Sequence, residues 1–313
     1  MKKWLKGLAA TLTAVFTLGF AACGTNGTVE KDITVVVREN SSGTREAFDK
    51  VVNDGNGNYL QMKDENGKTV YTVAKGAITQ TKTGNVLSSV ANDKNAIGYI
   101  SLGSVNDSVN VVKVNGVAPS TETVLDGTYS IQRPFVILAN ANVTLTPRAQ
   151  DFVNYLYSGE MAEHAEDAGV IFLQDETQRA HAGAEKIPVQ EYTPLTSLPD
   201  GAKIVVRGSS SMEKLFEEAA AGYAAQYNTT ADKIFDYELN GSSEGKKLAK
   251  EDKTGNAIGL SSSAVQDALV KSLNVCLDAV AVVVNKNNTA VTDRTLVQLY
   301  DIFSGKITKF SQL

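Results

Sequence analysis

The stretch ITVVVRENSSGTREAF, from Ile33 to Phe48, predicts a strand, a short loop and the start of a helix. Its β-branched residues, which favour strands, lead directly into Arg38. Serine, glycine and threonine fill the loop that follows, and a helical pattern begins after them. An arginine and a hydroxyl-rich loop therefore concentrate hydrogen-bond donors at one strand-to-helix turn.

The same unit recurs in the second half of the chain. VVRENSSGTREAF (36–48) resembles VVRGSSSMEKLF (205–216). GNVLSSVANDKNAIGYISLGSV (84–105) aligns without gaps on GKKLAKEDKTGNAIGLSSSAVQ (245–266), and both contain NAIG. Similarity in a fixed order is the sign of an internal duplication.

A third pair of segments completes the duplication. LTPRAQDFVNYLYSGE (145–160) aligns on VTDRTLVQLYDIFSGK (291–306). Each opens with threonine followed by proline or aspartate, which predicts a helix start, and closes with Ser-Gly, which predicts a helix end. We conclude that a unit of roughly 100 residues or more occurs twice.

Strand and helix patterns alternate in both units, which predicts an α/β fold with mostly parallel sheets. QRPFVILAN (132–140) and LDAVAVVVN (277–285) occupy equivalent places and are continuously apolar. Such runs predict fully buried strands or strands that cross between two lobes. The segment 174–203 contains three prolines and is interpreted as a linker along the surface.

Residues 1–22 have the pattern of an export signal peptide. Three lysines near the start precede an apolar stretch that ends in small residues. Cys23 follows directly, as in the lipobox of bacterial lipoproteins, so we expect it to carry lipid. The polar residues 23–32 would then be a tether that holds the exported protein at the outer face of the bacterial cytoplasmic membrane. The alternative is an ordinary signal peptide with an incidental cysteine.

Composition excludes several classes of protein. Without the signal peptide the chain has 27 Lys and Arg against 35 Asp and Glu, an acidic balance that disfavours nucleic-acid binding. Cys276 is then the only other cysteine, so no intramolecular disulfide is expected, and its apolar neighbours predict a buried thiol.

The chain offers little for catalysis. His164 and His181, its two histidines, lie far in sequence from the serine loops, which disfavours a Ser-His-acid triad, a secreted hydrolase or a histidine-based metal site. His164 is interpreted as a solvated helix residue. No Walker loop is present, and we predict neither enzyme activity nor a cofactor.

The serine loops are suited to holding an anion. Ser42, Gly43 and Thr44 enter one helix, and Ser210 and Ser211 enter its counterpart. Such loops offer hydroxyls, backbone N–H groups and the positive end of a helix dipole. Arg38 can add a charge-assisted contact. The alternative for each loop alone is an ordinary N-cap that stabilises its helix by ~1 kcal/mol.

A third loop, ELNGSSEGKKL (238–248), also places serines before a helix. By its residues alone, Ser242 and Ser243 are either helix caps or ligand groups.

These motifs together resemble the phosphate-binding proteins of ABC transporters. VVVRENSSGTREAF is similar to that family's Arg-Glu-Asp-Gly-Ser-Gly-Thr-Arg signature, and NAIGYISLGSV, IVVRGSSSMEKL, LDAVAVVVN and LVQLYDIFSGKITKF resemble others. The resemblance covers nearly all of the chain after the signal. The order differs, since the Ser-Ser-Ser loop usually comes first, and joining Leu313 to Val29 would restore it. The chain therefore resembles a circular permutant.

The resemblance implies a periplasmic-binding-protein-like fold in which two α/β lobes close on the ligand. One lobe would comprise 30–131 with 286–313 and the other 141–276, joined by hinge strands at 132–140 and 277–285. Each unit would lend its last helix to the opposite lobe. The implied phosphate ligands are Arg38, Ser42, Gly43, Thr44, Ser210, Ser211 and Ser242. Arg45 would lie behind the loop.

Two positions depart from the family pattern. Ala257 stands where many members have an aspartate, whose carboxylate would accept a hydrogen bond from protonated phosphate and select against sulfate. Asn40 replaces an aspartate that would steady the arginine. Asn256 and the serines 261–263 are candidates for supplying a neutral acceptor in its place.

We therefore expect a lipid-anchored, monomeric binding protein that captures inorganic phosphate and passes it to the membrane permease and ATPase of an ABC importer. The alternatives are a binding protein for sulfate or an organic phosphate, and a surface sensor or adhesin-like module that has lost transport.

Overall fold

The computed structural model describes residues 32–173 and 191–313. Residues Lys31–Leu313 form one compact unit. The predicted signal peptide, Cys23 and nearly all of the predicted tether lie outside the described residues, as do His181 and positions 174–190 of the predicted linker.

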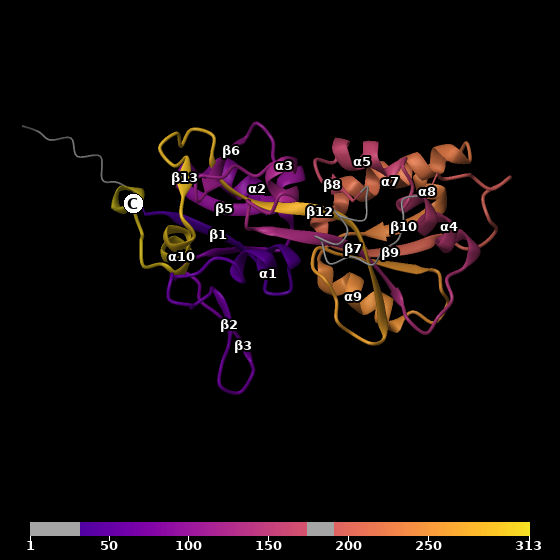
Figure 1. Cartoon of the computed structure of the whole chain (residues 1–313), viewed down its shortest axis with the longest axis horizontal. Coiled ribbons are helices and arrows are strands. Elements are labelled where there is room, and N and C mark those ends of the chain that lie inside the picture. The colour runs from indigo at the N-terminus through magenta and orange to yellow at the C-terminus, as the bar shows by residue number, and fades with distance from the viewer. Residues whose placement is uncertain (1–31, 174–190) are drawn as a thin grey trace, which may run out of the picture. The chain divides into compact units, whose positions relative to one another are not determined.

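The described residues form a mixed α/β fold with two lobes (Figure 1). The first lobe contains β1 (Thr34–Arg38), β4 (Ile78–Gln80), β5 (Ala96–Ser101), β6 (Val109–Val114), β13 (Asp293–Arg294) and the hairpin of β2 (Gln61–Lys63) and β3 (Thr69–Tyr71). The second lobe contains β8 (Ile171–Phe172), β9 (Ile204–Gly208), β10 (Phe235–Glu238) and β11 (Ala257–Ser261). Two strands, β7 (Gln132–Asn140) and β12 (Val270–Asn285), belong to both lobes.

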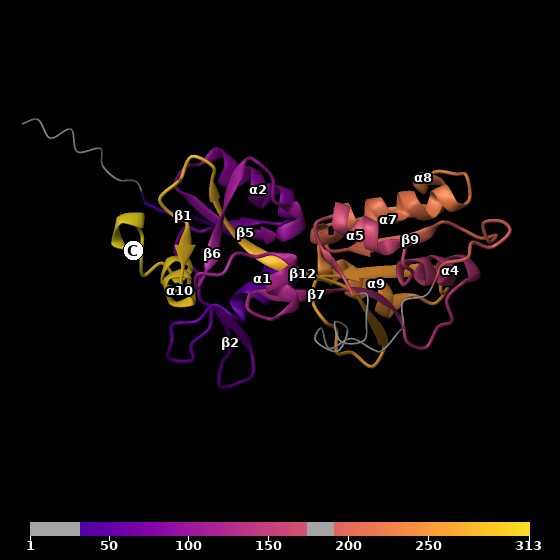
Figure 2. The same cartoon turned by 45° about the horizontal axis from the view of Figure 1, so that its top comes forward.

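Helices flank the sheet in both lobes (Figure 2). The first lobe has α1 (Gly43–Asp49), α2 (Thr83–Asn92), α3 (Thr121–Leu125), α10 (Leu296–Ser304) and the short 3-10 helices η1 (Leu102–Ser104) and η3 (Phe310–Gln312). The second has α4 (Pro147–Leu156), α5 (Met161–Asp167), α7 (Glu213–Gln226), α8 (Ala231–Ile234), α9 (Ser242–Glu251) and the 3-10 helix η2 (Ser210–Met212). Within the described ranges, no helix combines the length and the apolar character that crossing a membrane requires.

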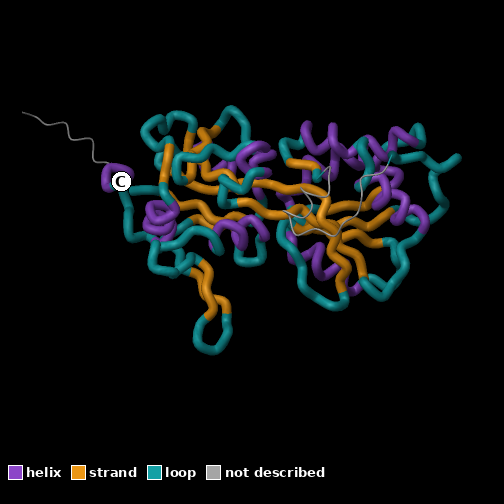
Figure 3. The backbone as a smooth tube through the Cα atoms, in the orientation of Figure 1, coloured by secondary structure: helices purple, strands orange, loops and turns teal. Residues whose placement is uncertain are grey.

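One sheet runs through both lobes in the order β10-β9-β11-β7-β12-β5-β1-β4 (Figure 3). Its two outer parts are parallel: β9 pairs in parallel with β10 and β11, and β1 with β4 and β5. The central strands β7 and β12 are antiparallel to each other and to their neighbours. The predicted parallel α/β character therefore holds on either side of an antiparallel centre.

The two apolar runs of the sequence are these central strands. β7 has the predicted bounds, whereas β12 begins seven residues earlier than the predicted run, at Val270. The two strands pair from Val270 opposite Asn140 to Ala279 opposite Gln132, with an irregularity near Cys276. Cys276 is fully buried, as expected.

The buried apolar side chains form two large cores. The members of one core lie between Phe135 and Cys276 in the sequence. The other core combines buried side chains between Val35 and Ile131 with those of α10 and of β12 from Leu277 onward. Ile171 of β8 and the adjacent Leu173 belong to the second core, whereas Phe172 belongs to the first. The exact lobe limits predicted from the sequence remain a prediction.

Glycine allows a helix to approach the centre of the sheet in each lobe. A Cβ atom on Gly259 of β11 would lie 2.2 Å from the Gly245 carbonyl oxygen of α9. The approach at Gly98 of β5 is less close: a Cβ atom there would lie 3.1 Å from side-chain atoms of Val86 and Val90 of α2. Since these glycines are the last residues of the two NAIG motifs, the duplicated motif sets how α2 and α9 lie on the strands.

The predicted helix ends are partly correct. Thr146 caps α4 through Ala149 N–H, and Pro147 is its first residue, as the Thr-Pro pattern predicts. The corresponding prediction at Thr292 is wrong: Asp293 and Arg294 pair with β6, so α10 begins at Leu296. Gly305, with φ of 81°, ends α10 in the left-handed region, as predicted.

A buried ion pair joins the central strands. Nε and Nη2 of Arg133 on β7 donate to Oδ2 of Asp278 on β12 at 3.0 and 2.8 Å. Ser101 at the end of β5 donates to the other carboxylate oxygen at 2.8 Å. Burial raises the pKa of Asp278 although Arg133 opposes the shift, and burial lowers the pKa of Arg133. The two charges depend on each other because neither reaches water.

We predict that Asp278→Ala lowers the free energy of unfolding by about 3–5 kcal/mol, because it leaves the Arg133 guanidinium buried without a counter-charge. Combining it with Arg133→Met should recover part of the loss. Asp267→Ala, at the exposed pair with Lys250, should lower the free energy of unfolding far less, because surface ion pairs contribute little. Urea titrations of the variants measure these values, and equal losses at the two sites would contradict the prediction.

Candidate anion-binding site

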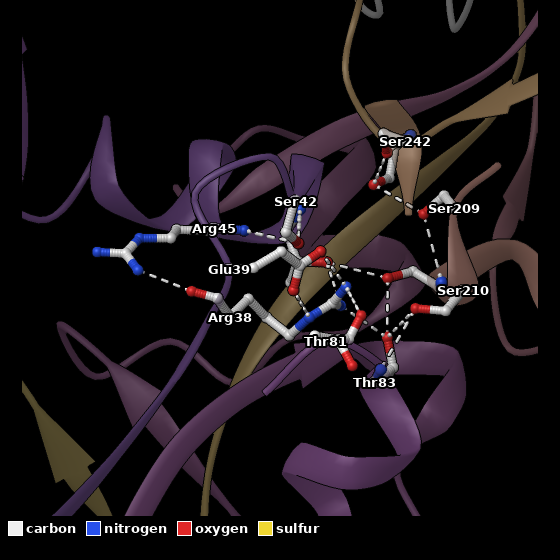
Figure 4. Close-up of polar contacts among 12 residues, drawn as sticks. Arg38, Glu39, Ser42, Arg45, Thr81, Thr83, Ser209, Ser210 and Ser242 are labelled. Carbon is white, nitrogen blue, oxygen red and sulfur yellow. Dashed lines mark hydrogen bonds and ion pairs between the residues drawn. The ribbon is translucent and has the colours of Figure 1, made fainter. Parts of the chain in front are cut away.

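The candidate site lies where strands of both lobes end. β1 ends at Arg38 and is followed by the loop that enters α1. β9 ends at Gly208 before the serine loop of η2, and β11 ends at Ser261. The starts of α2 and α9 lie beside these loops (Figure 4). Loops that follow parallel strands meet at one edge of the sheet, and ligands commonly bind there.

Eight buried side chains from both lobes form what we call the hydroxyl cluster. Its members are Ser42, Thr44, Thr83, Ser209, Ser210, Ser211, Ser242 and Ser262, each at most 6% exposed. The two lobes meet in it. Oγ of Ser211 lies 2.9 Å from Oγ1 of Thr44 and 3.1 Å from Oγ1 of Thr83. The backbone N–H of Thr83 donates to Oγ of Ser210 at 3.3 Å.

The cluster continues within the second lobe. Oγ of Ser209 donates to Oγ of Ser262 at 3.0 Å, and Oγ of Ser242 lies 3.2 Å from the same atom. Ser42 caps α1 by accepting from the N–H groups of Thr44 and Arg45. Ser42 can therefore be both a helix cap and part of the site, because the side chain that caps α1 also belongs to the hydroxyl cluster.

Arg38 supplies the positive charge of the site. It is 2% exposed, and each of its five guanidinium N–H groups has an acceptor. Nε and Nη2 donate to the two oxygens of Glu39, and Nη2 also donates to the Thr81 carbonyl, all at 3.0 Å. Nη1 donates to Oγ1 of Thr83 at 3.1 Å and of Thr44 at 3.5 Å. Two of the five acceptors are thus hydroxyls of the cluster.

Glu39, rather than residue 40, steadies this arginine. The Glu39 carboxylate forms the ion pair with Arg38, whereas the Asn40 side chain is exposed. Glu39 therefore has the role that the family pattern gives to an aspartate at position 40.

Arg45 lies behind the loop, as expected. Its Nη1 donates to the Arg38 carbonyl at 2.7 Å and its Nε to Asp49 at 2.9 Å. The guanidinium also packs 4.7 Å from the centre of the Tyr71 ring. Burial raises the pKa of Asp49 to about 6, despite the Arg45 charge. Arg45 thus fixes the backbone at Arg38 and does not reach the hydroxyl cluster.

The structure brings together all seven residues singled out from the sequence. Arg38, Ser42 and Thr44 are connected to Ser210 and Ser211 as described above. Ser242 joins them through Ser262. Gly43 contributes a close approach between the lobes: a Cβ atom there would lie 2.5 Å from Oγ of Ser262 and 2.8 Å from its carbonyl. Whether these residues bind a ligand remains a prediction.

Sequence reasoning missed four residues of the site: Glu39, Thr83, Ser209 and Ser262. Ser262 lies within the run 261–263, which was considered only as a group. Thr83 could have been found from the duplication, because it immediately precedes the aligned segment at Gly84, close to the place that Ser242 and Ser243 occupy before Gly245 in the other unit. α2 and α9 are both ten residues long, and no N-cap side chain caps either of them.

Position 257 is not at the site. Ala257 is the first residue of β11 and pairs with Val205, whereas the site follows the last residue, Ser261. At about 3.3 Å per residue, the two ends are roughly 13 Å apart. An aspartate at 257 could not contact the cluster, so the predicted position of the acceptor is wrong. Asn256 is also excluded, since it donates to the Lys203 carbonyl and accepts from Thr146.

His164 is partly buried, not solvated as predicted. Its Nε2 lies 2.6 Å from the Tyr155 hydroxyl. The two side chains border a hollow of about 650 Å³ on the second lobe, away from the hydroxyl cluster. No group of three or more potential metal ligands occurs in the parts of the chain that the structure describes.

Residues 3–160 and 189–313 match the family model of the PBP superfamily domain. The chain belongs to this superfamily. Membership confirms the predicted periplasmic-binding-protein-like fold with two lobes.

Several members are similar over most of their length. Phosphate-binding protein PstS 2 of Streptococcus pneumoniae is 34% identical over 319 residues, which cover 99% of each chain. Phosphate-binding protein PstS 2 of Streptococcus agalactiae is 31% identical, covering 90% of this chain and 87% of the relative. The crystal structure of a phosphate-binding protein of a phosphate ABC transporter from S. pneumoniae superimposes with a TM-score of 0.64 at 35% identity, covering 90% of this chain and 99% of that one.

The match with PstS 2 of S. pneumoniae runs from end to end. The aligned segments of this relative are therefore in the same order as in this chain. The predicted circular permutation can therefore concern only members with another order, and it remains a prediction.

We predict that Gly43→Ala destabilises the protein by about 1–3 kcal/mol, because the methyl group meets the Ser262 backbone of the other lobe. Gly84→Ala is the control. It lies in open space in the first turn of α2, where alanine should be neutral or stabilise by up to about 1 kcal/mol. Thermal unfolding compares the two variants. If Gly43→Ala is as stable as the original protein, the lobes do not approach each other at this glycine.

Proposed function

We propose that the protein is the solute-binding component of an ABC importer and captures inorganic phosphate outside the cytoplasmic membrane. The observation that carries the proposal is the hydroxyl cluster around Arg38, to which both lobes contribute. In the described part of the chain, no group of three or more acidic, histidine or cysteine side chains could hold a metal ion there. The names of the relatives support phosphate as the ligand.

The chemistry of the cluster suits a tetrahedral oxyanion. Hydroxyl groups donate and accept equally well, so they can exchange their mutual hydrogen bonds for bonds to the oxygens of an anion. The N-termini of α2 and α9 add positive dipole ends from the first and second lobes, respectively. Arg38 provides a full charge that the anion would share with Glu39. No bond is made or broken, so the protein acts by binding and not as an enzyme.

The proposed ligand residues are Arg38, Ser42, Gly43, Thr44, Ser210, Ser211 and Ser242, to which we add Thr83 and Ser262. In this proposal the lobes 30–131 with 286–313 and 141–276 close on the anion by bending at 132–140 and 277–285. The closed form would present phosphate to the permease, whose ATPase drives uptake. Lipid on Cys23 would hold the protein at the membrane, where the permease lies.

Titration of the purified protein with phosphate in a calorimeter tests this function. We predict one site per chain and a loss of at least about 100-fold in affinity in Arg38→Met, because buried charge-assisted hydrogen bonds disappear. Arg207 provides a matched control. It is the counterpart of Arg38 in the second unit, but it pairs with Asp236 and the Val206 carbonyl away from the cluster. Arg207→Met should bind within about twofold of the original protein.

Absence of phosphate binding in the original protein would refute the proposed ligand. Equal losses in the Arg38 and Arg207 variants would refute the proposed place of the site.

Thr83 is tested separately. We predict that Thr83→Val, which keeps the shape of the side chain, weakens phosphate binding roughly tenfold, or about 1.4 kcal/mol. Thr83→Ser should retain most of the affinity because it keeps the hydroxyl. Thr79→Val, on the exposed side of β4, is the control. Full affinity in Thr83→Val would remove this residue from the ligand set.

A further inference from the structure

Arg133, on the central strand β7, has a donor group that no residue of the described structure uses. Its Nε and Nη2 donate to Asp278, but Nη1 is buried and has no hydrogen-bond partner within the described residues. The residue is 3% exposed, whereas Glu160 and Arg294, which also contain an unpaired buried atom, are partly exposed. A buried donor of a charged group is costly to leave unpaired, so it indicates a missing partner.

The unpaired atom points away from β12. Nε and Nη2 form one edge of the planar guanidinium, and this edge faces Asp278, which is directly opposite Arg133 on β12. Nη1 lies on the other side of the central carbon. On that side of β7 runs β11, whose last residue, Ser261, pairs with Val136. Nη1 is therefore directed toward the place where β11 ends and Ser262 of the hydroxyl cluster follows.

The first lobe brings its part of the site to the same place. Ser101, the last residue of β5, donates to Asp278. Tyr99 lies on the same face of β5, two residues earlier, and its hydroxyl accepts from the backbone N–H of Arg38 at 3.3 Å. Helix α1, whose first turn contains Thr44 of the cluster, packs against both β5 and β12. The guanidinium on β7 thus lies between the end of β11 in the second lobe and the arginine loop of the first.

The two arginines also act on each other electrostatically. Burial lowers the pKa of Arg133, Asp278 opposes this shift, and the charge of Arg38 lowers the pKa further. An anion between the two guanidinium groups would relieve their repulsion. Every N–H group of Arg38 already has an acceptor, so Arg133 is the one of the two that can bind an anion without giving up a bond.

We propose that Arg133 is a second arginine of the anion site and that its Nη1 donates a hydrogen bond to a bound tetrahedral oxyanion. This inference rests on the proposed phosphate-binding function and adds a ligand residue from a strand that both lobes share (Figure 1). Because Arg133 lies on β7 and its ion-pair partner on β12, the anion is then connected directly to the two strands at which the lobes would bend.

The test measures phosphate binding by calorimetry in two variants that share Asp278→Asn and differ only at residue 133. Asp278→Asn keeps the size of the side chain and an acceptor for Ser101, but it frees Arg133 from its counter-charge. We expect this variant to bind phosphate at least as tightly as the original protein. The double variant Arg133→Met/Asp278→Asn should bind at least about tenfold more weakly than Asp278→Asn, because a charge-assisted hydrogen bond is lost.

Two further variants complete the design. Arg133→Lys keeps a cation beside Asp278 but has no second arm, so it should bind at least about fivefold more weakly than the original protein. It decides the question if the double variant does not fold. Arg148→Met is the matched control, because Arg148 is a buried arginine of α4 that donates to the carbonyls of Pro199 and Ala202. These carbonyls precede β9, at the opposite end of this strand from the cluster, and phosphate affinity should stay within about twofold.

Each result supports or overturns the proposal. Weaker binding in the double variant than in Asp278→Asn supports it, as does weaker binding in Arg133→Lys. Equal affinity in Asp278→Asn and the double variant, or full affinity in Arg133→Lys, would leave Arg133 only the neutralisation of Asp278 and overturn it. An equal loss in Arg148→Met would reduce the effect to net charge and also overturn it. If the original protein binds no phosphate, the proposed function itself fails, and this is seen before any variant is measured.

Discussion

The pairing of β7 with β12 is the interaction on which the rest of the fold depends. These strands are antiparallel to each other, and the other strands of the main sheet are added outward from them. β11, β9 and β10 follow in one lobe and β5, β1 and β4 in the other, while β8 and β6 pair with β12 directly and β13 pairs with β6. Because both lobes grow from the same two strands, the loops that follow β1, β9 and β11 meet in one cluster. The Arg133–Asp278 pair lies within this central pairing and connects through Ser101 to the end of β5. Each ion compensates the other where water is excluded.

The second constraint is the burial of Arg38. A guanidinium that is 2% exposed needs an acceptor for each N–H group, and the chain supplies them from its own loop, from Thr81 and from the start of α2. Glu39 balances the charge, and Arg45 holds the Arg38 carbonyl from behind. The counterpart of Arg38 in the second unit, Arg207, is paired with Asp236 near the surface instead. The duplication thus repeats the backbone unit, while the buried charge occurs in one lobe only.

Local patterns account for the parts of the fold that sequence reasoning predicted well. The bounds of β7, the threonine cap and proline start of α4 and the glycine end of α10 follow from residues next to one another in the chain. The start of α10 was misplaced because Asp293 and Arg294 pair with β6, a partner about 180 residues away. His164 was misjudged for a different reason: its partner Tyr155 is only nine residues away, but the contact depends on how α5 packs against the preceding helix α4. Motif resemblance located the serine loops correctly but placed the acidic group at the wrong end of β11.

The sequence by itself determined the alternation of strands and helices, the internal duplication and the set of hydroxyl-rich loops, because each depends on residue type and short spacing. Tertiary structure alone decided which of these loops meet. It brought Thr83 into contact with Ser210 and Ser211, more than 120 positions away, and set Gly43 against Ser262. It also decided that Glu39, and not residue 40 or 257, borders the site. Which side of a turn a carboxylate faces depends on strand register and on the opposite lobe, and neither is encoded in the local pattern.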